Sequence, residues 1–302
     1  QKTTTPMHIL QILEATGGGS RKHVLLITKA LVQAGHTVDL VLSPLRADPD
    51  FSDDLETYRG LGCRVELWEI PKLPGPGDWS LLRRLKALVR ERRPDVIHSH
   101  CGKAGFLSRV LGKLLGRNSP AIVHTPHSYY FQGFVSPMKR CLAIRLERWL
   151  SRTGRLFCIS QAETETIAKH RIAPATRVDV GRNGLPADFV DGLMPAAAAR
   201  QELGLSEDVV AVGVFARYVA RKGHKWLLRA IRAMDPALRA QTRFLFIGRG
   251  PEEERIKQRI ETLELSDVVS CPGYRSHVDR LVAGIDIAVL PSYYEGLSYQ
   301  LL

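Results

Sequence analysis

The chain has 302 residues, of which 44% are hydrophobic and 25% charged, and this balance excludes a disordered or low-complexity protein. No apolar run approaches the length of a membrane span, and residues 1–13 do not have the pattern of a secretory signal peptide. The five cysteines are scattered and odd in number, which disfavours a disulfide framework or a zinc site and favours a reducing cytosol.

The net charge of +12 comes from the first part of the chain. Residues 1–186 contain 28 Lys and Arg against 16 Asp and Glu, whereas residues 187–302 contain 15 of each kind. This asymmetry suggests that the first part approaches an anionic surface, such as lipid headgroups, nucleic acid or a polyphosphate. Arginine-rich helices without any such role would give the same count, so the sequence leaves both explanations open.

Apolar strand-like runs alternate with segments of helical periodicity along the chain. In the first part we expect strands at residues 8–13, 36–42, 64–69, 95–98, 121–125, 156–160 and 177–180. The same reasoning predicts helices at residues 24–34, 81–92, 107–115 and 139–150. After a turn cluster at 183–186, a helix-like stretch begins at residue 195. In this second part we expect strands at residues 209–216, 243–248, 268–270 and 285–290. Helices are expected at residues 224–234, 252–263 and 276–283.

The predicted strands are apolar and separated by helices, which is the pattern of parallel sheets covered on both faces. The predicted fold class is therefore α/β, with two Rossmann-like domains whose parallel sheets face each other across a cleft. The turn cluster Asn183-Gly184-Leu185-Pro186 places the boundary between a first domain of residues 7–186 and a second domain of residues 187–302.

Glycine-rich or cationic loops follow two of the predicted strands. Gly17-Gly18-Gly19-Ser20 precedes a helix whose free N–H groups would suit a diphosphate, but the spacing is not GxGxxG and a plain turn is the alternative. Arg217 and Lys222 follow the strand at 209–216, and two cations at the carboxyl end of a parallel strand could clamp a diphosphate. A solvated basic loop is the alternative there.

Three further loops occupy the same kind of position. Gly248-Arg249-Gly250-Pro251 is a tight turn after a strand and a candidate wall for a nucleobase, and Cys271-Pro272-Gly273-Tyr274 takes the equivalent place after the next strand. Glu295 lies in the run 291–298 after the last strand, where a carboxylate can accept hydrogen bonds from sugar hydroxyls. The backbone N–H groups that follow it could bind a phosphate.

Taken together, these loops resemble the motifs of the retaining family-four glycosyltransferases of the GT-B fold, of the bacterial surface-polysaccharide type. The matching elements are the glycine loop at 17–20, Ala216-Arg217 through Lys222-Gly223, Ile247-Gly248-Arg249-Gly250-Pro251, Gly273-Tyr274, and Pro291-Ser292 through Glu295-Gly296-Leu297. Asp95-Val96-Ile97-His98-Ser99-His100 is similar to the family's DVIHxH strand, and Asn183-Gly184 to the NG turn before its second domain. The resemblance covers essentially the whole chain, in the right order.

The resemblance implies roles for individual residues. Arg217 and Lys222 would bind the donor diphosphate, and Glu295 would contact the donor sugar. His127, in Thr125-Pro126-His127, would contact the transferred sugar, with a structural loop histidine as the alternative. The residues implied in holding the rest of the donor are Gly18, Gly19, Gly248, Gly250, Tyr274, Gly296, Leu297 and Ser298.

No metal site and no cofactor are expected beyond the nucleoside-diphosphate hexose itself. His98 and His100 lie at a strand end, and without carboxylates in ligand spacing we expect them to be structural or acceptor-side residues. His124 lies close to His127 and could be confused with it.

The chain departs from the family pattern at its end. The family pairs its glutamate with a second one eight positions later, which usually binds the nucleotide ribose, and from Glu295 that position would be 303. On this pattern the sequence looks like a truncated enzyme with an incomplete second domain, and the competence of such a chain is open.

The function implied is that of a metal-independent hexosyltransferase, which moves a sugar from a nucleotide sugar to a lipid-linked or polysaccharide acceptor with retention of anomeric configuration. The cationic segments 83–93 and 139–155 suggest a cytoplasmic protein that binds peripherally to the anionic inner face of the plasma membrane. One alternative is a non-catalytic module that binds nucleotide sugars. The other is a basic nucleic-acid-binding protein, although no recognised module is visible and nucleic acid is not an expected partner.

Overall fold

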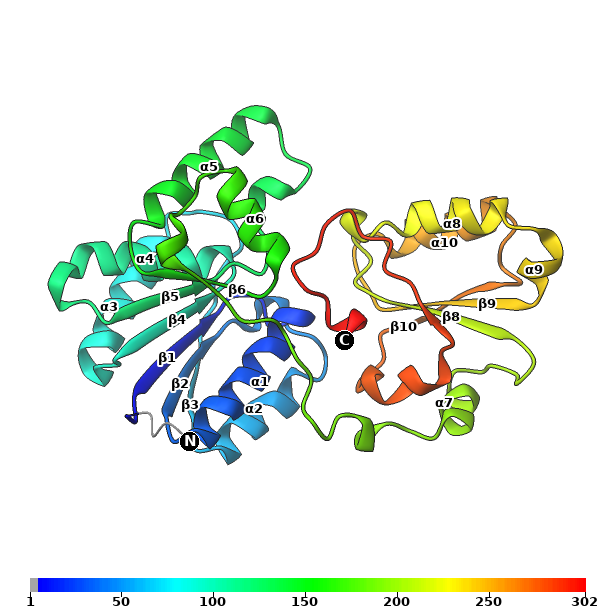
Figure 1. The fold of residues 1–302 in the computed structure, drawn as a ribbon, viewed down its shortest axis with the longest axis horizontal. Helices are drawn as coiled ribbons and strands as arrows, with labels where there is room; N and C mark the ends of the chain where they lie inside the picture. Colours follow the sequence, from blue (N-terminus) through cyan, green and yellow to red (C-terminus); the bar gives the residue numbers. More distant parts are fainter. Residues whose placement is uncertain (1–4) are drawn as a thin grey trace. The chain divides into compact units, whose positions relative to one another are not determined.

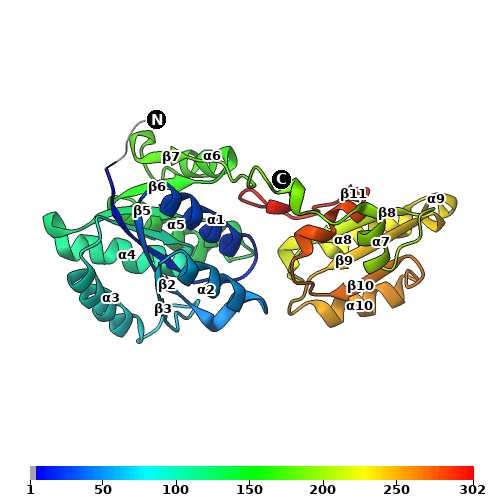
Figure 2. The same ribbon diagram turned by 90° about the horizontal axis from the view of Figure 1, so that it is seen from below.

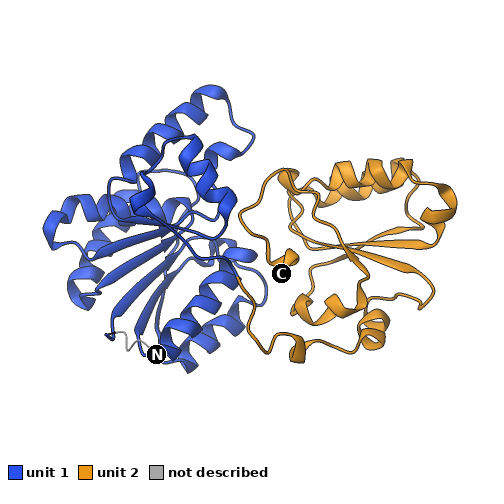
Figure 3. Ribbon diagram, viewed as in Figure 1, with its two compact units in different colours: residues 1–183 blue, residues 184–302 orange. Residues whose placement is uncertain are grey.

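The computed structural model describes residues 5–302 of the chain. The chain divides into two compact units, Gln1–Asn183 and Gly184–Leu302 (Figure 3). The division falls three residues before the boundary expected from the turn at 183–186. Both units have an α/β fold built on a parallel sheet, which is the predicted fold class.

Unit 1 contains a seven-stranded sheet in the order β3-β2-β1-β4-β5-β6-β7, with every neighbouring pair parallel. Its strands are β1 (His8–Leu13), β2 (Thr37–Leu42), β3 (Arg64–Leu67), β4 (Val96–His100), β5 (Ala121–Thr125), β6 (Arg155–Cys158) and β7 (Val178–Val180). The order reverses between β1 and β4, so the loops that leave these two strands run in opposite directions. Ligands of open parallel sheets bind at such a reversal, beyond the carboxyl ends of the strands.

The helices of unit 1 cover both faces of this sheet (Figure 1). They are α1 (Gly19–Gln33), α2 (Phe51–Gly60), α3 (Asp78–Arg92), α4 (Gly102–Leu115), α5 (Pro137–Leu150) and α6 (Gln161–Lys169). Val24 of α1 packs with Leu13 and Leu42 on one face, whereas Leu107 of α4 packs with Leu10 and other residues on the opposite face. Alternate residues of a strand point to opposite faces, so a strand that is covered on both faces must be apolar along its whole length.

Unit 2 contains a four-stranded parallel sheet in the order β10-β9-β8-β11 (Figure 2). Its strands are β8 (Val210–Phe215), β9 (Thr242–Ile247), β10 (Val269–Gly273) and β11 (Ile287–Ala288). Its helices are α7 (Ala196–Glu202), α8 (His224–Ala233), α9 (Pro236–Ala240) and α10 (Glu253–Thr262). Residues of α8 and α10, such as Leu228 and Ile256, pack with Val214 and Phe246 of the sheet in a single core.

The structure corrects three details predicted from the sequence in unit 2. The segment expected as a helix at 276–283 is a 3₁₀ helix, Val278–Gly284, and the strand expected at 285–290 pairs only over Ile287–Ala288. The Cys-Pro-Gly of the expected loop at 271–274 belongs to β10 itself. A local apolar pattern cannot distinguish these outcomes, because they depend on which neighbour supplies the hydrogen bonds.

Within residues 5–302, no helix combines the length and the hydropathy that crossing a bilayer requires.

Candidate active site

Two motifs that lie far apart in the sequence meet at the carboxyl edge of the sheet in unit 2. Lys222, in the loop after β8, places its Nζ 2.6 Å from Oε1 of Glu295, in the loop after β11. Arg221 approaches the other carboxylate oxygen of Glu295 at 3.9 Å. The side chains of Lys222 and Glu295 are only 11% and 19% exposed. β8 and β11 are neighbours in the sheet, and this adjacency brings the cation and the carboxylate together.

Gly223 allows the two loops to approach. It has a left-handed backbone with a φ of +73°, and a Cβ at this position would lie 1.9 Å from the backbone oxygen of Pro291. Two residues away in each loop, the N–H of Tyr293 donates to the carbonyl of Arg221 at 2.9 Å. Only glycine fits between two backbones at this distance, so the contact that aligns Lys222 with Glu295 depends on Gly223.

Lys222 lies between the Glu295 carboxylate and the positive charges of two arginines, and these groups set the electrostatics of this edge. Burial lowers the pKa of Lys222, Glu295 acts to raise it, and the charges of Arg221 and Arg217 lower it further. Arg217 is exposed and follows β8 almost directly. A cationic group that is close to other cations gains most from a dianionic ligand, because the ligand relieves their mutual repulsion.

The glycine turn after β9 is pressed against the loop after β8. A Cβ at Gly248 would lie 2.0 Å from the carbonyl oxygen of Ala216, and a Cβ at Gly250 would lie 2.4 Å from that of Tyr218. The guanidinium of Arg249 lies 5.4 Å from the centre of the Tyr274 ring, over which it is placed. The structure therefore brings Gly248, Gly250 and Tyr274 to the same edge as Arg217.

The residues after Glu295 form the last turn of the chain. Gly296, Leu297 and Ser298 are partly exposed, and the Ser298 hydroxyl accepts a hydrogen bond from the N–H of Gln300 at 3.3 Å. The side-chain amide of Gln300 donates to the carbonyl of Val289 at 2.7 Å, which ties this turn to the residue after β11. The three predicted residues thus lie between Glu295, which contacts Lys222, and Gln300, which is bonded to Val289.

In unit 1, the glycine loop at 17–20 contacts residues of the loop that follows β2. The N–H of Gly18 donates to Oδ2 of Asp48 at 2.7 Å, and a Cβ at Gly17 would lie 2.8 Å from the carbonyl of Arg46. α1 begins at Gly19, after a left-handed Gly18 with a φ of +65°. The Gly18 amide, which we expected to face the donor diphosphate, is therefore hydrogen-bonded to a carboxylate in this structure.

His127 lies in the loop after β5, in a left-handed conformation with a φ of +57°. Its Nε2 is 3.2 Å from Nδ1 of His100, the last residue of β4. Burial lowers the pKa of both imidazoles well below the usual value, so they are neutral at physiological pH. His124, by contrast, is a buried residue of β5 whose ring packs against Gly105 of α4 and whose Nδ1 lies 3.1 Å from the Ser99 carbonyl oxygen.

Sequence reasoning missed two residues of this region. His23, in α1, is buried beside His100 and His127, with ring centroids 5.4 and 4.8 Å away. Its position one helical turn after Gly19 was the available signal. Asp48, which holds Gly18, lies in a polar loop whose sequence gives no indication of the contact.

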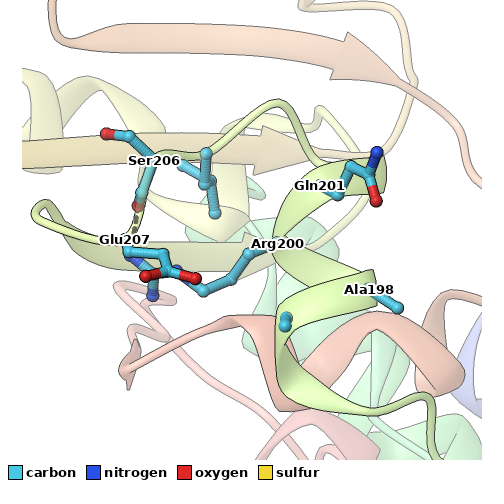
Figure 4. Close-up of a pocket in the computed structure, with 7 residues that line it drawn as sticks. Ala198, Arg200, Gln201, Ser206 and Glu207 are labelled. Atoms are coloured by element: carbon cyan, nitrogen blue, oxygen red, sulfur yellow. Dashed lines mark hydrogen bonds between the residues drawn. The ribbon is translucent and has the colours of Figure 1, made fainter.

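Unit 2 also contains a pocket that is lined by other residues (Figure 4). It is lined by Ala197, Ala198, Arg200, Gln201, Leu205, Ser206 and Glu207. These residues precede β8, at the opposite end of that strand from Arg217. The Arg200 guanidinium donates to the carbonyls of Ser206 and Val209 and to Asp286, so it supports the fold rather than presenting a charge to a ligand.

Comparison with known proteins gives a consistent result for both units. Residues 18–184 match the family described as Glycosyl transferase 4-like domain, and residues 196–302 match Glycosyl transferases group 1. The chain is similar to the UDP-Gal:alpha-D-GlcNAc-diphosphoundecaprenol alpha-1,3-galactosyltransferase of Escherichia coli, at 24% identity over 74% of this chain and 59% of that protein. It is also similar to the lipopolysaccharide core biosynthesis glycosyltransferase LpsD of Rhizobium meliloti, at 29% identity over 96% of this chain and 73% of that protein.

Solved structures share the fold at lower sequence identity. HepE of Anabaena, crystallised with UDP and glucose, has a TM-score of 0.74 at 21% identity, over 96% of this chain and 76% of HepE. WaaG, a glycosyltransferase involved in lipopolysaccharide biosynthesis, has a TM-score of 0.71 at 16% identity, over 96% of this chain and 76% of WaaG. The matched region spans only about three fifths of the E. coli galactosyltransferase. Because the two family models together match nearly all of residues 18–302, the chain belongs to the family-four glycosyltransferases of the GT-B fold.

Proposed function

We propose that this protein transfers a hexose from a nucleoside-diphosphate sugar to a saccharide acceptor, and that Arg217 and Lys222 bind the donor diphosphate. The observation that carries the proposal is the contact of 2.6 Å between Lys222 and Glu295 at the sheet edge that also presents Arg217. In the proposed complex, Lys222 would contact the phosphates, and the carboxylate of Glu295 beside it would accept hydrogen bonds from the sugar. Gly248, Gly250 and Tyr274 would hold the base, and Gly296, Leu297 and Ser298 the phosphate.

The proposed reaction breaks the bond between the anomeric carbon and the diphosphate oxygen, which keeps the electron pair. Arg217 and Lys222 stabilise that developing charge, so the step requires no metal ion. The acceptor hydroxyl oxygen bonds to the anomeric carbon on the face that the diphosphate leaves, which retains the configuration, and its proton passes to the departing phosphate oxygen. His127 would contact the transferred sugar. Retention of the anomeric configuration is what the resemblance to the family-four glycosyltransferases implies.

The donor is proposed to be a UDP-hexose. The E. coli relative carries UDP-Gal in its name, and HepE has been crystallised with UDP-glucose. A thermal-shift screen of the full-length protein against UDP-, GDP- and ADP-hexoses tests this choice. We expect only the UDP-sugars to raise the melting temperature, since binding to the native state stabilises it by mass action. If only GDP-sugars or only ADP-sugars raised the melting temperature, the donor base would be guanine or adenine instead of uracil.

Substitution of the two cations tests the diphosphate contact. Loss of one charge contact to the leaving group typically costs about 2–4 kcal/mol in the transition state, so Arg217→Ala and Lys222→Ala should each lower turnover at least tenfold. Arg232→Ala, which removes an exposed arginine of α8, is the matched control and should leave turnover unchanged. Near-normal turnover in both active-site variants would remove the assignment.

The acceptor is proposed to be lipid-linked, because one face of α5 is apolar and exposed among cations. Met138, Leu142 and Trp149 are exposed although they are large and hydrophobic, and they are spaced to share one side of the helix with Leu146. Ile144 packs toward the core instead, and Leu150 is buried. Lys139, Arg140, Arg145 and Arg148 of the same helix are exposed.

An apolar stripe flanked by cations suits an anionic membrane surface. We expect the full-length protein to sediment with vesicles containing phosphatidylglycerol at low salt and to be released as salt screens the charges. Leu142→Glu should weaken the binding at least tenfold, because burial of a leucine contributes about 1.5–3 kcal/mol. Leu238→Glu, at an exposed leucine of unit 2, is the matched control. If the wild-type protein ignored these vesicles, the acceptor would be a soluble saccharide.

Two other functions make different predictions. A non-catalytic nucleotide-sugar-binding module would show the thermal shift with UDP-hexose but neither hydrolyse nor transfer the sugar. A nucleic-acid-binding protein would bind random oligonucleotides in a salt-dependent way and show no response to nucleotide sugars. The family assignment and the Lys222–Glu295 contact favour the transferase.

A further inference from the structure

Three histidines of unit 1 converge from separate elements. His23 comes from α1, His100 ends β4, and His127 lies in the loop after β5. One ring nitrogen from each lies within 4.8 Å of the others. β4 lies between β1 and β5, with His100 opposite Leu13 on one side and Thr125 on the other, so the sheet order itself places the three imidazoles together.

Hydrogen bonds fix the proton on the His100 ring. The Thr28 hydroxyl donates to the carbonyl of Val24 at 2.7 Å, so its oxygen accepts from the side-chain N–H of Gln11 at 2.8 Å. The Gln11 carbonyl oxygen therefore faces His100 Nε2, 3.1 Å away, and that nitrogen must donate. It follows that Nδ1 of His100 carries a lone pair, directed at Nε2 of His127 at 3.2 Å.

The His23 ring is fixed in the same manner. Its Nδ1 lies 2.9 Å from the side-chain oxygen of Asn183 and must donate to it. Its Nε2 then carries the lone pair, and this atom is buried without a hydrogen-bond partner anywhere in residues 5–302. A buried acceptor without a partner is costly, which indicates that an electrophilic ligand completes it.

We infer that His23, His100 and His127 bind a divalent transition-metal ion such as Zn²⁺. Zinc sites with three histidines keep a fourth, open position for water or a substrate oxygen, and Zn–N bonds measure about 2.0–2.1 Å. Two ligands of a tetrahedral ion are then about 3.3 Å apart. His100 and His127 already have this spacing, at 3.2 Å. His23 would need to move by at most about 1.5 Å, judged from the 4.8 Å limit of the cluster.

The surroundings of the imidazoles have the features of a metal site. A metal-binding histidine usually donates its other N–H to a protein oxygen, and Gln11 and Asn183 supply that oxygen for two of the three ligands. His127 is partly exposed and gives the ion a route of entry. To bind the ion through Nε2, the His127 ring would move its proton from Nε2 to Nδ1, so metal binding would release no net proton.

This site goes beyond the proposed transfer reaction, which requires no metal. A bound ion would occupy the imidazole proposed to contact the transferred sugar, and it would therefore inhibit transfer. Metal binding itself can be measured without any sugar, so its test is independent of the proposed function.

The test is a titration of the metal-free, full-length protein with Co²⁺, followed by visible absorption, and then displacement by Zn²⁺. A tetrahedral histidine site gives the intense visible bands of four-coordinate Co²⁺, whereas exposed histidines give the weak spectrum of six-coordinate Co²⁺. We expect one tight equivalent per chain. His23→Phe and His127→Asn should each lower the affinity at least tenfold, and His277→Asn, at an exposed histidine of unit 2, should not.

The melting temperature of each variant without metal shows whether it is folded, and His23→Gln replaces His23→Phe if the latter does not fold. The absence of a four-coordinate spectrum in the wild-type protein would overturn the inference. The inference would also be overturned if the four-coordinate spectrum persisted in both the folded His23 variant and the His127→Asn variant.

Discussion

Gly223→Ala tests whether backbone contact between two loops assembles the candidate donor site. The added Cβ would lie 1.9 Å from the backbone oxygen of Pro291, whereas ordinary contact begins at 3.4 Å, so the loops must separate by about 1.5 Å. A shift of this size breaks the hydrogen bond of 2.9 Å from Tyr293 to Arg221 and the contact of 2.6 Å between Lys222 and Glu295.

The expected destabilisation has two parts that a second variant separates. A non-glycine residue in the left-handed region costs about 1–2 kcal/mol, and overpacking adds about 1–3 kcal/mol. Gly204 has a φ of +69°, close to the +73° of Gly223, but a Cβ there meets nothing within 4 Å. Gly204→Ala therefore measures the backbone cost alone, in the same unit, and should destabilise by about 1–2 kcal/mol. Gly223→Ala should destabilise by about 2–5 kcal/mol.

Urea unfolding gives the stability of both variants, and calorimetry gives their affinity for UDP. We expect Gly223→Ala to bind UDP at least tenfold more weakly than the wild-type protein, because the loops that carry Lys222 and Glu295 have moved apart. Gly204→Ala should bind UDP normally. If both variants lost the same stability and bound UDP equally well, the loop contact at Pro291 would not be what assembles the site.

Three further predictions concern ionisable groups. Burial raises the pKa of Glu163 to about 7 from 4.5, so its stabilising contribution is complete below pH 4.5 and is lost as the pH rises through about 7. The change in the free energy of unfolding caused by Glu163→Gln should therefore be more favourable at pH 8 than at pH 4, by up to about 3 kcal/mol in urea unfolding. Equal changes at the two pH values would contradict this. Glu147→Ala should cost about 3–5 kcal/mol in the same assay, because it strands the fully buried Arg109 guanidinium, which Glu147 contacts at 2.9 Å; a loss below 1 kcal/mol would exclude that account. A double-mutant cycle of Lys222→Ala and Glu295→Ala, measured by unfolding, should give a coupling of about 0.5–3 kcal/mol, and additivity would show that their contact contributes no stability.

Much of the fold can be read from the sequence, since it depends on local patterns. β1 and β5 begin and end at the predicted residues, because an apolar run bounded by turn residues has few alternatives to a buried strand. α2 and α6 were not predicted. Their sequences are mostly polar and contribute few buried side chains, such as Phe51 and Ile167, so the periodic signal is weak.

The candidate donor residues were chosen because they follow predicted strands and match motifs of the family, and the carboxyl ends of parallel strands share one edge of the sheet. The sequence therefore determined the family and the residue types at that edge. Only the tertiary structure decided that Lys222 contacts Glu295, that Asp48 holds Gly18 and that His23 joins His100 and His127. These contacts span tens of residues, and they depend on strand order and on the close approach of backbones, which no local pattern of residues encodes.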